Sequence, residues 1–332
     1  MLGGSKMDEK MREVVEQYEV ELKNVYRFRG AYMLDTKNGL MILREFRGTK
    51  SKAELAQQIK EGLISQGFSN VDVYLRNKKE ELITENSMGT RYVLKRWFTG
   101  EECNLKDKKS VADAAKNLAV MHGFMKGILP KTIEFQGDTF PMVIRKHNRE
   151  LRRVRAYIRE KKQRNEFELL FLSLFSEFYK EAEETEEMLE EFSYEELYTD
   201  MAEQQTLCHG SYNYHNILFT PQGIATTCFE KAQLQIQIMD FYDFVRKIME
   251  KNNWNEGYLD AALNSYESVR AFSKEEKKAL YIALAYPEKF WKVTNFYYNR
   301  KKTWFSAKNI EKLQVLQQQK NQRRAVLKKL EY

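Results

Sequence analysis

Two residues of this chain, His209 and Asn216, have the types and the spacing of a loop that could support chemistry. A loop of the form H-x-D-x-x-x-x-N serves phosphoryl transfer: its aspartate accepts the proton of a substrate hydroxyl, and its asparagine binds magnesium. Here Ser211 stands where the aspartate would be. A serine hydroxyl has no useful basicity near neutral pH, so the sequence predicts a loop of this shape without its base.

The segments that precede the loop predict a β-rich first third. The predicted strands cover 25–34, 40–46, 71–75 and 92–97. The first two flank the segment 35–39, whose Asn-Gly pair is typical of a hairpin turn. A helix is predicted from Ser51 to Gln66, where Gly67 can adopt the left-handed conformation that ends helices.

After about Phe98 the pattern becomes mostly helical. Apolar residues recur at helical spacing in two stretches. They are Val111, Ala114, Ala115 and Leu118, with Ser110 as the expected N-cap, and Phe167, Leu170, Phe171, Leu174 and Phe178. A strand–loop–strand block over 216–229 interrupts the helices, which resume at Asp240. The sequence therefore predicts an α+β, bilobal protein, with a β-sheet and helix lobe over 1–97 and a helical lobe over 98–332.

Several blocks of sequence resemble one family. The stretch 208–219 resembles the catalytic-loop block of the spore coat protein S (CotS) family of endospore-forming bacteria, within the aminoglycoside-phosphotransferase type of kinase fold. Blocks resembling that family's inter-lobe hinge, its next block and its C-terminal signatures follow in order at 97–103, 226–231, 240–251 and 286–292. The resemblance runs from about Val20 to Lys320 and implies a protein-kinase-like fold with a small β-rich N-lobe and a large helical C-lobe.

The resemblance also implies roles for two later positions. In such kinases the metal-binding aspartate ends the second strand after the loop, and a further aspartate about a dozen residues on caps a helix and braces the loop. On this register Cys228 occupies the metal position, and Asp240 braces the loop with His209. The alternative register gives Asp240 the metal role, but Asp240 follows Asn216 by 24 residues, a long excursion for a two-strand turn.

The nucleotide side of the expected site is equally altered. Kinases hold phosphates with a lysine in the third strand, and the matching strand of this chain offers Arg44, a bulkier, forked cation. Arg44 and Asn216 are thus expected as remnants of nucleotide and metal binding. The turn that would cover phosphates, 27–32, has only Gly30. Glu54 and Glu61 are the two candidates for the helix carboxylate that would pair with Arg44. For both residues we favour the simpler interpretation, an exposed carboxylate on a helix.

These replacements predict a pseudokinase with a structural or interaction role in spore coat formation. No cofactor is then expected; ATP and magnesium enter only under the alternative, an active small-molecule phosphotransferase of the aminoglycoside or choline kinase type with Asp243 or Glu230 as a displaced base. A third hypothesis is a nucleotide or ligand binder without chemistry, with a small molecule in the inter-lobe cleft. Expected partners are spore coat or other proteins, first in the mother-cell cytoplasm and then in the spore coat.

The composition narrows the possible classes of protein further. The 332 residues contain no run of about 18 apolar residues and no N-terminal secretory signal, so no membrane insertion is expected. Three unpaired cysteines predict neither a disulfide framework nor a zinc site.

The charge pattern gives the remaining predictions. The net charge is +7, with ten Lys or Arg between 145 and 164 and an acidic run over 181–196. We expect the two runs to complement each other as solvated helix faces, the segment 317–324 to be an exposed helix, and no nucleic acid to be bound.

Overall fold

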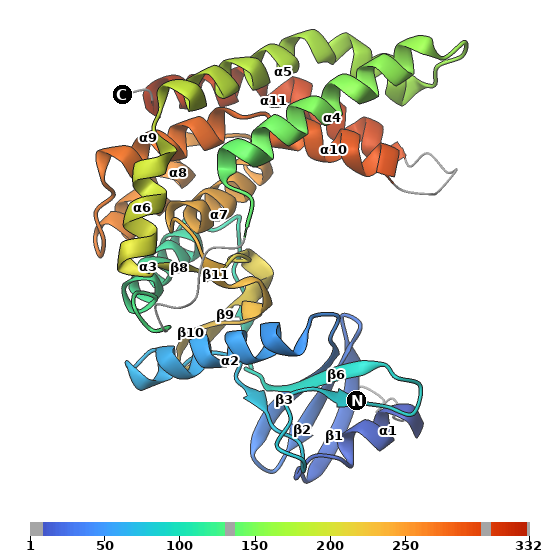
Figure 1. Cartoon of the computed structure of the whole chain (residues 1–332), viewed down its shortest axis with the longest axis vertical. Coiled ribbons are helices and arrows are strands. Elements are labelled where there is room, and N and C mark those ends of the chain that lie inside the picture. Colours follow the sequence, from blue (N-terminus) through green and yellow to red (C-terminus); the bar gives the residue numbers. More distant parts are fainter. Residues whose placement is uncertain (1–8, 130–136, 300–306, 331–332) are drawn as a thin grey trace.

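The computed structural model describes residues 9–129, 137–299 and 307–330 (Figure 1). Its N-terminal part is an antiparallel sheet with strand order β1-β2-β3-β6-β4, and β5 also pairs with β6. The elements of this part are α1 (Glu9–Val15), β1 (Leu22–Phe28), β2 (Ala31–Thr36), β3 (Gly39–Glu45), α2 (Lys50–Ser65), β4 (Tyr74–Leu75), β5 (Thr84–Glu85) and β6 (Arg91–Arg96).

Local sequence explains these elements. The predicted strand 25–34 is split by a two-residue turn, Arg29-Gly30, in which both residues have positive φ, the geometry of a tight hairpin. The Asn-Gly turn predicted between the next two strands is confirmed, with Thr36 paired to Gly39. Helix α2 begins after Thr49, whose side chain accepts a bond from the Lys52 N–H, and ends before Gly67, which has φ +100°. Of the strand predicted over 71–75, only Tyr74–Leu75 pairs in this sheet.

The C-terminal part is mostly helical. Its helices are α3 (Lys108–Phe124), α4 (Phe140–Glu160), α5 (Glu166–Glu191), α6 (Tyr194–Gln204), α7 (Ile238–Lys251), α8 (Glu256–Glu267), α9 (Lys274–Ala285), α10 (Glu288–Asn299) and α11 (Ala307–Leu330). Short strands lie before and between these helices: β7 (Glu101–Glu102), β8 (Leu207–Cys208), β9 (Ile217–Thr220), β10 (Gly223–Thr226) and β11 (Gln233–Leu234). Two 3-10 turns, η1 (Tyr214–Asn216) and η2 (Phe229–Lys231), follow β8 and β10.

The two predicted apolar stripes are buried, in α3 and α5. The predicted cap of α3 is wrong: Asp107, not Ser110, precedes the helix, and its carboxylate accepts bonds from the Lys109 and Ser110 N–H groups. The carboxylate is the better cap because it can accept both bonds and favours the positive end of the helix dipole.

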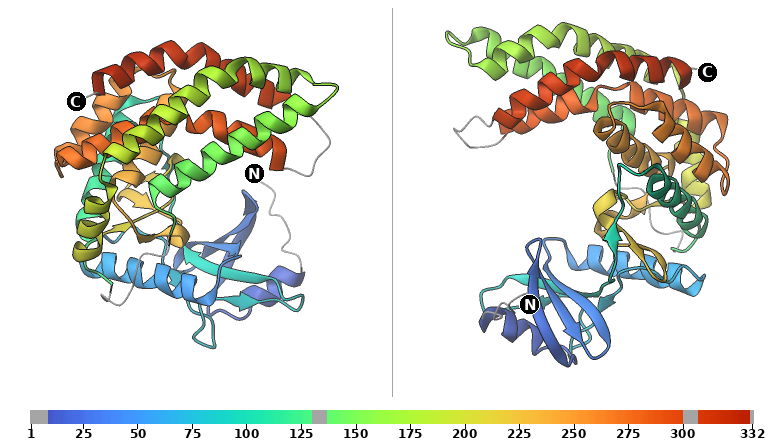
Figure 2. Two further views of the ribbon diagram at one scale, coloured as in Figure 1. Left: turned by 45° about the horizontal axis from the view of Figure 1, so that its top comes forward. Right: turned by 180° about the vertical axis from the view of Figure 1, so that it is seen from behind.

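The three largest of four apolar cores among the described residues hold most of the molecule together. The largest joins α2 to α3, α7, α8 and α9, a second lies between α4, α5, α10 and α11, and a third lies between α1 and the sheet. Figures 1 and 2 show the sheet at one end, the arm of α4, α5, α10 and α11 at the other, and α2 where the two parts meet. The predicted α+β, bilobal, kinase-like fold is confirmed.

Candidate functional site

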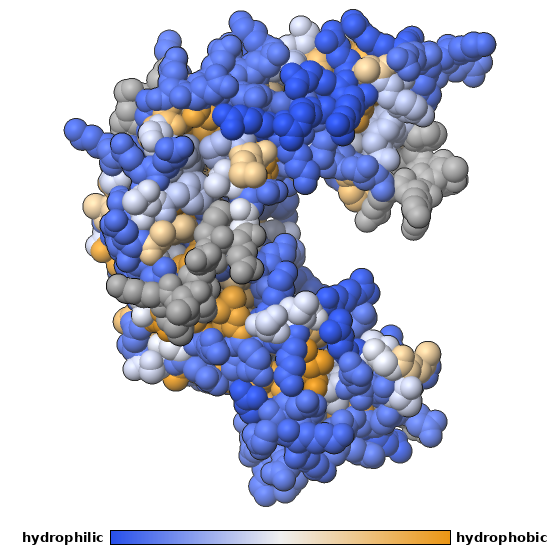
Figure 3. Space-filling model, viewed as in Figure 1, coloured by the Kyte–Doolittle hydropathy of each residue, from blue (hydrophilic) through white to orange (hydrophobic). Residues whose placement is uncertain are grey.

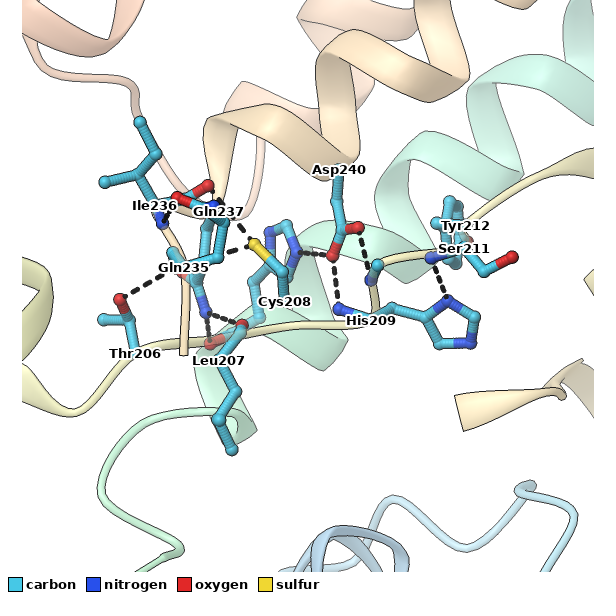
Figure 4. Close-up of polar contacts among 12 residues, drawn as sticks. Thr206, Leu207, Cys208, His209, Ser211, Tyr212, Gln235, Ile236, Gln237 and Asp240 are labelled. Atoms are coloured by element: carbon cyan, nitrogen blue, oxygen red, sulfur yellow. Dashed lines mark hydrogen bonds and ion pairs between the residues drawn. The ribbon is translucent and has the colours of Figure 1, made fainter. Parts of the chain in front are cut away.

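The loop 209–216 is held by Asp240, at the start of α7 (Figure 4). Its carboxylate accepts the His209 N–H at 2.5 Å and the Gly210 N–H at 2.8 Å, and its Oδ2 lies 3.2 Å from His122 Nε2. Burial alone would raise the pKa of Asp240, but its hydrogen bonds and electrostatic interactions with His122 and His209 outweigh burial and lower the pKa. Asp240 therefore carries a buried negative charge that fixes the loop backbone.

His209 is fixed in one tautomer by its two ring contacts. Its Nδ1 accepts the Ser211 N–H at 3.2 Å, and its Nε2 donates to the Thr227 carbonyl at 3.0 Å. Burial lowers the pKa of this imidazole. His209 is therefore a neutral packing residue that connects the loop to the end of β10.

Gly210 is required where the loop passes η2. It has φ +69°, and a Cβ built there would lie 2.2 Å from the Lys231 carbonyl oxygen. No other residue type fits this close approach without moving the backbone.

Ser211 and Asn216 contact each other. The Asn216 amide donates to the Ser211 carbonyl at 2.9 Å and lies 3.3 Å from Ser211 Oγ, and Asn213 makes a similar pair of contacts. The loop thus keeps the compact turn expected from its spacing. The residue at its base position offers a hydroxyl, which cannot accept a proton at neutral pH.

Cys228 and Arg44 meet on the other side of this loop. Cys228 follows β10, has φ +70°, and its Sγ lies 3.6 Å from Arg44 Nη1. Burial raises the pKa of the thiol, so it stays protonated. The register that places Cys228 near Asn216 and Arg44 agrees with this geometry, since all three residues line one cavity. Asp240 is not among the residues that line this cavity.

A cavity of about 560 Å³ lies between the two parts of the molecule. It is lined by Phe28, Arg29, Arg44, Trp97, Phe98, Gly100, Glu102, His215, Asn216, Leu218 and Cys228. At its rim Arg29, from the β1–β2 turn, forms an ion pair with Glu102 and lies 2.8 Å from His215 Nδ1. His215 Nδ1 in turn lies 2.7 Å from Glu102 Oε2. Three side chains from distant segments thus close one edge of the cavity.

This cavity does not fit a magnesium ion bound in the kinase manner. Magnesium prefers carboxylates together with phosphate oxygens. The two residues at the expected metal position are an amide and a protonated thiol, and a guanidinium lies 3.6 Å from that thiol. Glu102, the carboxylate in the cavity lining given above, is already paired with Arg29. Among the described residues, no group of three or more His, Cys, Asp or Glu is arranged to hold a metal.

A buried ionic cluster, which the sequence did not predict, lies behind Cys228. Asp72 Oδ2 is 3.0 Å from Lys95 Nζ and accepts the Cys228 N–H at 2.9 Å, and Asp72 Oδ1 is 3.3 Å from Lys60 Nζ. Lys95 also forms an ion pair with Glu230. Lys60, Asp72 and Lys95 are completely buried.

The cluster keeps two of its members, Lys95 and Glu230, in their charged forms. Burial disfavours the charged form of Lys95, but Asp72 and Glu230 outweigh it and raise its pKa well above the ordinary value. Burial would likewise raise the pKa of Glu230, but Lys95 and Lys60 lower it to about 2. The two lysines and two carboxylates therefore link α2, the segment before β4, strand β6 and η2.

The remaining candidates have structural contacts. Glu54 pairs with Arg76 at 3.4 Å, and Glu61 accepts a bond from Gln57, so neither pairs with Arg44. Asp243 pairs with Arg246 one turn along α7.

Of the two proposed displaced bases, Glu230 is engaged by Lys95 and accepts a bond from the Tyr74 hydroxyl. Its carboxylate is held ionised at a pKa of about 2, far below that of a useful base near neutral pH.

Comparison with known proteins gives a family and a fold. The family model described as "Spore coat putative kinase YutH" matches residues 11–330. An aminoglycoside phosphotransferase from Alicyclobacillus acidocaldarius superposes with a TM-score of 0.86 at 20% identity, covering 99% of this chain and 98% of that one.

Two further solved structures have the same fold. Spectinomycin phosphotransferase APH(9)-Ia, in complex with ADP and spectinomycin, gives a TM-score of 0.66 at 11% identity over 95% of each chain. A microcompartment-associated aminopropanol kinase gives 0.60 at 12% identity over 96% and 97%. The predicted resemblance to spore coat proteins of kinase-like fold is confirmed at the level of the family.

Proposed function

The chain belongs to the spore coat putative kinase YutH family, and we propose that it is a pseudokinase of that family. In this proposal it is a kinase-fold protein that acts in the spore coat through its surfaces and transfers no phosphate. The observation that carries the proposal is the contact of Arg44 with the protonated thiol of Cys228 where a metal carboxylate is needed. In this proposal the protein is made in the mother-cell cytoplasm and joins the coat by binding other coat proteins.

The chemistry of phosphoryl transfer supports this proposal. The reaction depends on positioned charge: metal ions neutralise the phosphates and a carboxylate receives the hydroxyl proton. Ser211 replaces the base, and Cys228 replaces a metal ligand. Loss of a general base alone lowers a rate by roughly 10²–10⁴-fold, and loss of the metal ligand adds to this.

The internal charges also support a structural role. The ion pairs of the cluster join its own members, Lys60, Asp72, Lys95 and Glu230, and not groups of the cavity. It joins the N-terminal sheet to α2 and to the segment after Cys228. A fold held in one arrangement in this way suits a protein that presents fixed surfaces to partners.

One observation favours a second candidate, a small-molecule phosphotransferase. The cavity of about 560 Å³ is lined by aromatic side chains and two guanidinium groups, which are suited to an aromatic, anionic ligand. Under this candidate ATP and magnesium would be the cofactors.

A turnover assay separates the two candidates. Purified protein is incubated with ATP, magnesium and a panel of amino sugars and amino alcohols, and ADP release is measured beside the variant Asn216→Ala, with thermal unfolding as the check on folding. We expect the two proteins to release ADP at the same background rate. ADP release by the wild type that depends on one acceptor and is lost in Asn216→Ala would contradict the pseudokinase proposal.

A further inference from the structure

Helix α4 carries a basic surface that the carboxylates of the described residues pair with only at Arg145. The sequence analysis favoured two solvated helix faces that complement each other, the basic run 145–164 and the acidic run 181–196, but few of their charges are in direct contact. Both runs lie within the described residues, and one ion pair joins them, Arg145 to Glu186 at 3.9 Å.

The carboxylates on the adjoining part of α5 turn to α11 instead. Glu177 lies 3.0 Å from Lys320, and Glu181 lies 2.6 Å from Arg323 and 2.8 Å from Arg324. Arg323 is buried and also donates to the carbonyls of Leu284 and Ala285, so the predicted exposed segment 317–324 is in part a packed one. These two glutamates therefore pair with α11 and not with the basic side chains of α4.

We define the basic face as six exposed side chains of α4. They are Arg145, Lys146, Arg149, Arg152, Arg153 and Arg159. At 1.5 Å per residue the face is about 21 Å long. Met142 and Tyr157, which are 52% and 55% exposed, lie on the same side of the helix and add apolar contact area. Figure 3 shows this front surface of the upper arm as strongly hydrophilic and away from the hollow between the two parts.

A second surface of the same chain has the opposite sign. We define the acidic face as six exposed glutamates at the end of α5 and the start of α6. They are Glu183, Glu187, Glu190, Glu191, Glu195 and Glu196. None of these carboxylates forms an ion pair with another described residue within 4.0 Å. The acidic face lies at the other end of the α4–α5 hairpin from the tip, beside α9 (Figure 1).

We propose that the basic face of one copy binds the acidic face of a second copy, in a head-to-tail contact. The two faces are opposite in sign and have six charged side chains each, of which Arg145 already pairs with Glu186 of its own chain. Because the net charge of +7 makes copies repel on average, association needs two faces of opposite sign. A contact between different surfaces leaves one face open on each end, so it propagates into rings or filaments rather than closing as a dimer.

Sedimentation velocity over a concentration series at 50 mM and 500 mM NaCl tests this contact. The wild type is expected to form oligomers whose size grows with concentration at low salt, and to weaken at least about tenfold in affinity at high salt, because exposed charges are screened. Association therefore has to be lost in a variant that reverses three of the six charges of one face and so cancels the net charge of that face. The two variants are Lys146→Glu/Arg149→Glu/Arg153→Glu and Glu187→Lys/Glu190→Lys/Glu191→Lys.

The decisive experiment is to mix the two variants. Each variant alone has one face whose three reversed charges cancel its three remaining ones, so it is expected to stay monomeric. The mixture supplies an intact acidic face on one variant and an intact basic face on the other, and it is expected to associate. Thermal unfolding of each variant checks that it is folded. A monomeric wild type at low salt, association unchanged by either reversal, or a mixture that stays monomeric would overturn the proposal. So would a monomeric wild type that binds polyglutamate through the basic face, because the partner would then be another acidic protein.

Discussion

Replacing Lys95 with methionine is expected to lower the free energy of unfolding by about 3–5 kcal/mol, because removal of one partner leaves buried charge uncompensated. Lys95 Nζ contacts both Asp72, at 3.0 Å, and Glu230. Without it, Lys60 alone faces two carboxylates, of which Asp72 is completely buried. Urea unfolding followed by circular dichroism measures the change.

The matched control is Lys23→Met, which removes an exposed lysine from β1 of the same sheet. Its free energy of unfolding is expected to stay within about 0.5 kcal/mol of the wild type. A double variant, Lys95→Met/Glu230→Met, should lose less than the sum of the two single changes, since it removes both charges of the pair. A loss in Lys95→Met no larger than in Lys23→Met would mean that the cluster is not a stabilising feature of the fold.

Asp240→Asn is expected to destabilise the protein by about 2–4 kcal/mol at pH 7. The carboxylate accepts two backbone N–H bonds, from His209 and Gly210. The side-chain amide of asparagine has the same shape but only one acceptor oxygen. Its NH2 group would therefore face one of these two buried N–H donors. Asp243→Asn, three residues along α7 at a side chain that is 56% exposed, is the control and should change stability by less than about 1 kcal/mol.

The same variant has a characteristic pH dependence. Burial lowers the pKa of His122 and His209 in the folded protein, so the unfolded chain binds more protons below the ordinary value of 6.5. Wild-type stability is therefore greatest above pH 6.5 and falls as the pH drops. Asp240 partly offsets this for His122, since its bond and charge raise the pKa of that residue.

Removal of the charge should therefore widen the stability difference between wild type and Asp240→Asn as the pH falls from 7 to 5. Denaturant unfolding at half-unit pH steps measures this difference. A difference that is constant or narrows over that range would contradict the assignment of Asp240 as an ionised brace.

The local features of the fold were predictable from the sequence. The Asn-Gly turn, the helix that ends at Gly67 and the loop geometry from His209 to Asn216 depend on residues close together in the chain. Their conformations follow from backbone and turn preferences. The family resemblance placed Cys228 and Arg44 separately at two positions of one site, and in the structure Cys228 Sγ lies 3.6 Å from Arg44 Nη1.

The ionic cluster was not predictable, because its members come from four separate segments. One signal was present: Lys60 continues the buried face of α2 that Ala53, Ala56 and Leu63 define at helical spacing. A lysine on such a face requires a buried partner. The sequence did not say that the partner would be Asp72.

The charge runs failed as predictors for a related reason. Helices α4 and α5 are adjacent in sequence and pack together, so mutual pairing of their charges was the natural expectation. The glutamates Glu177 and Glu181 instead meet Lys320 and Arg324, more than 140 residues later. Tertiary packing, which no local sequence pattern records, decides which basic helix pairs with Glu177 and Glu181.

The central claim, that the site does not use magnesium to hold ATP, is tested most directly by calorimetric titration of ATP into the wild type, with magnesium and with EDTA. The account predicts the same affinity in both buffers, or no binding in either, because an amide, a protonated thiol and a guanidinium occupy the metal position. ATP binding that requires magnesium and is lost in Asn216→Ala would contradict the account and make the protein a candidate enzyme.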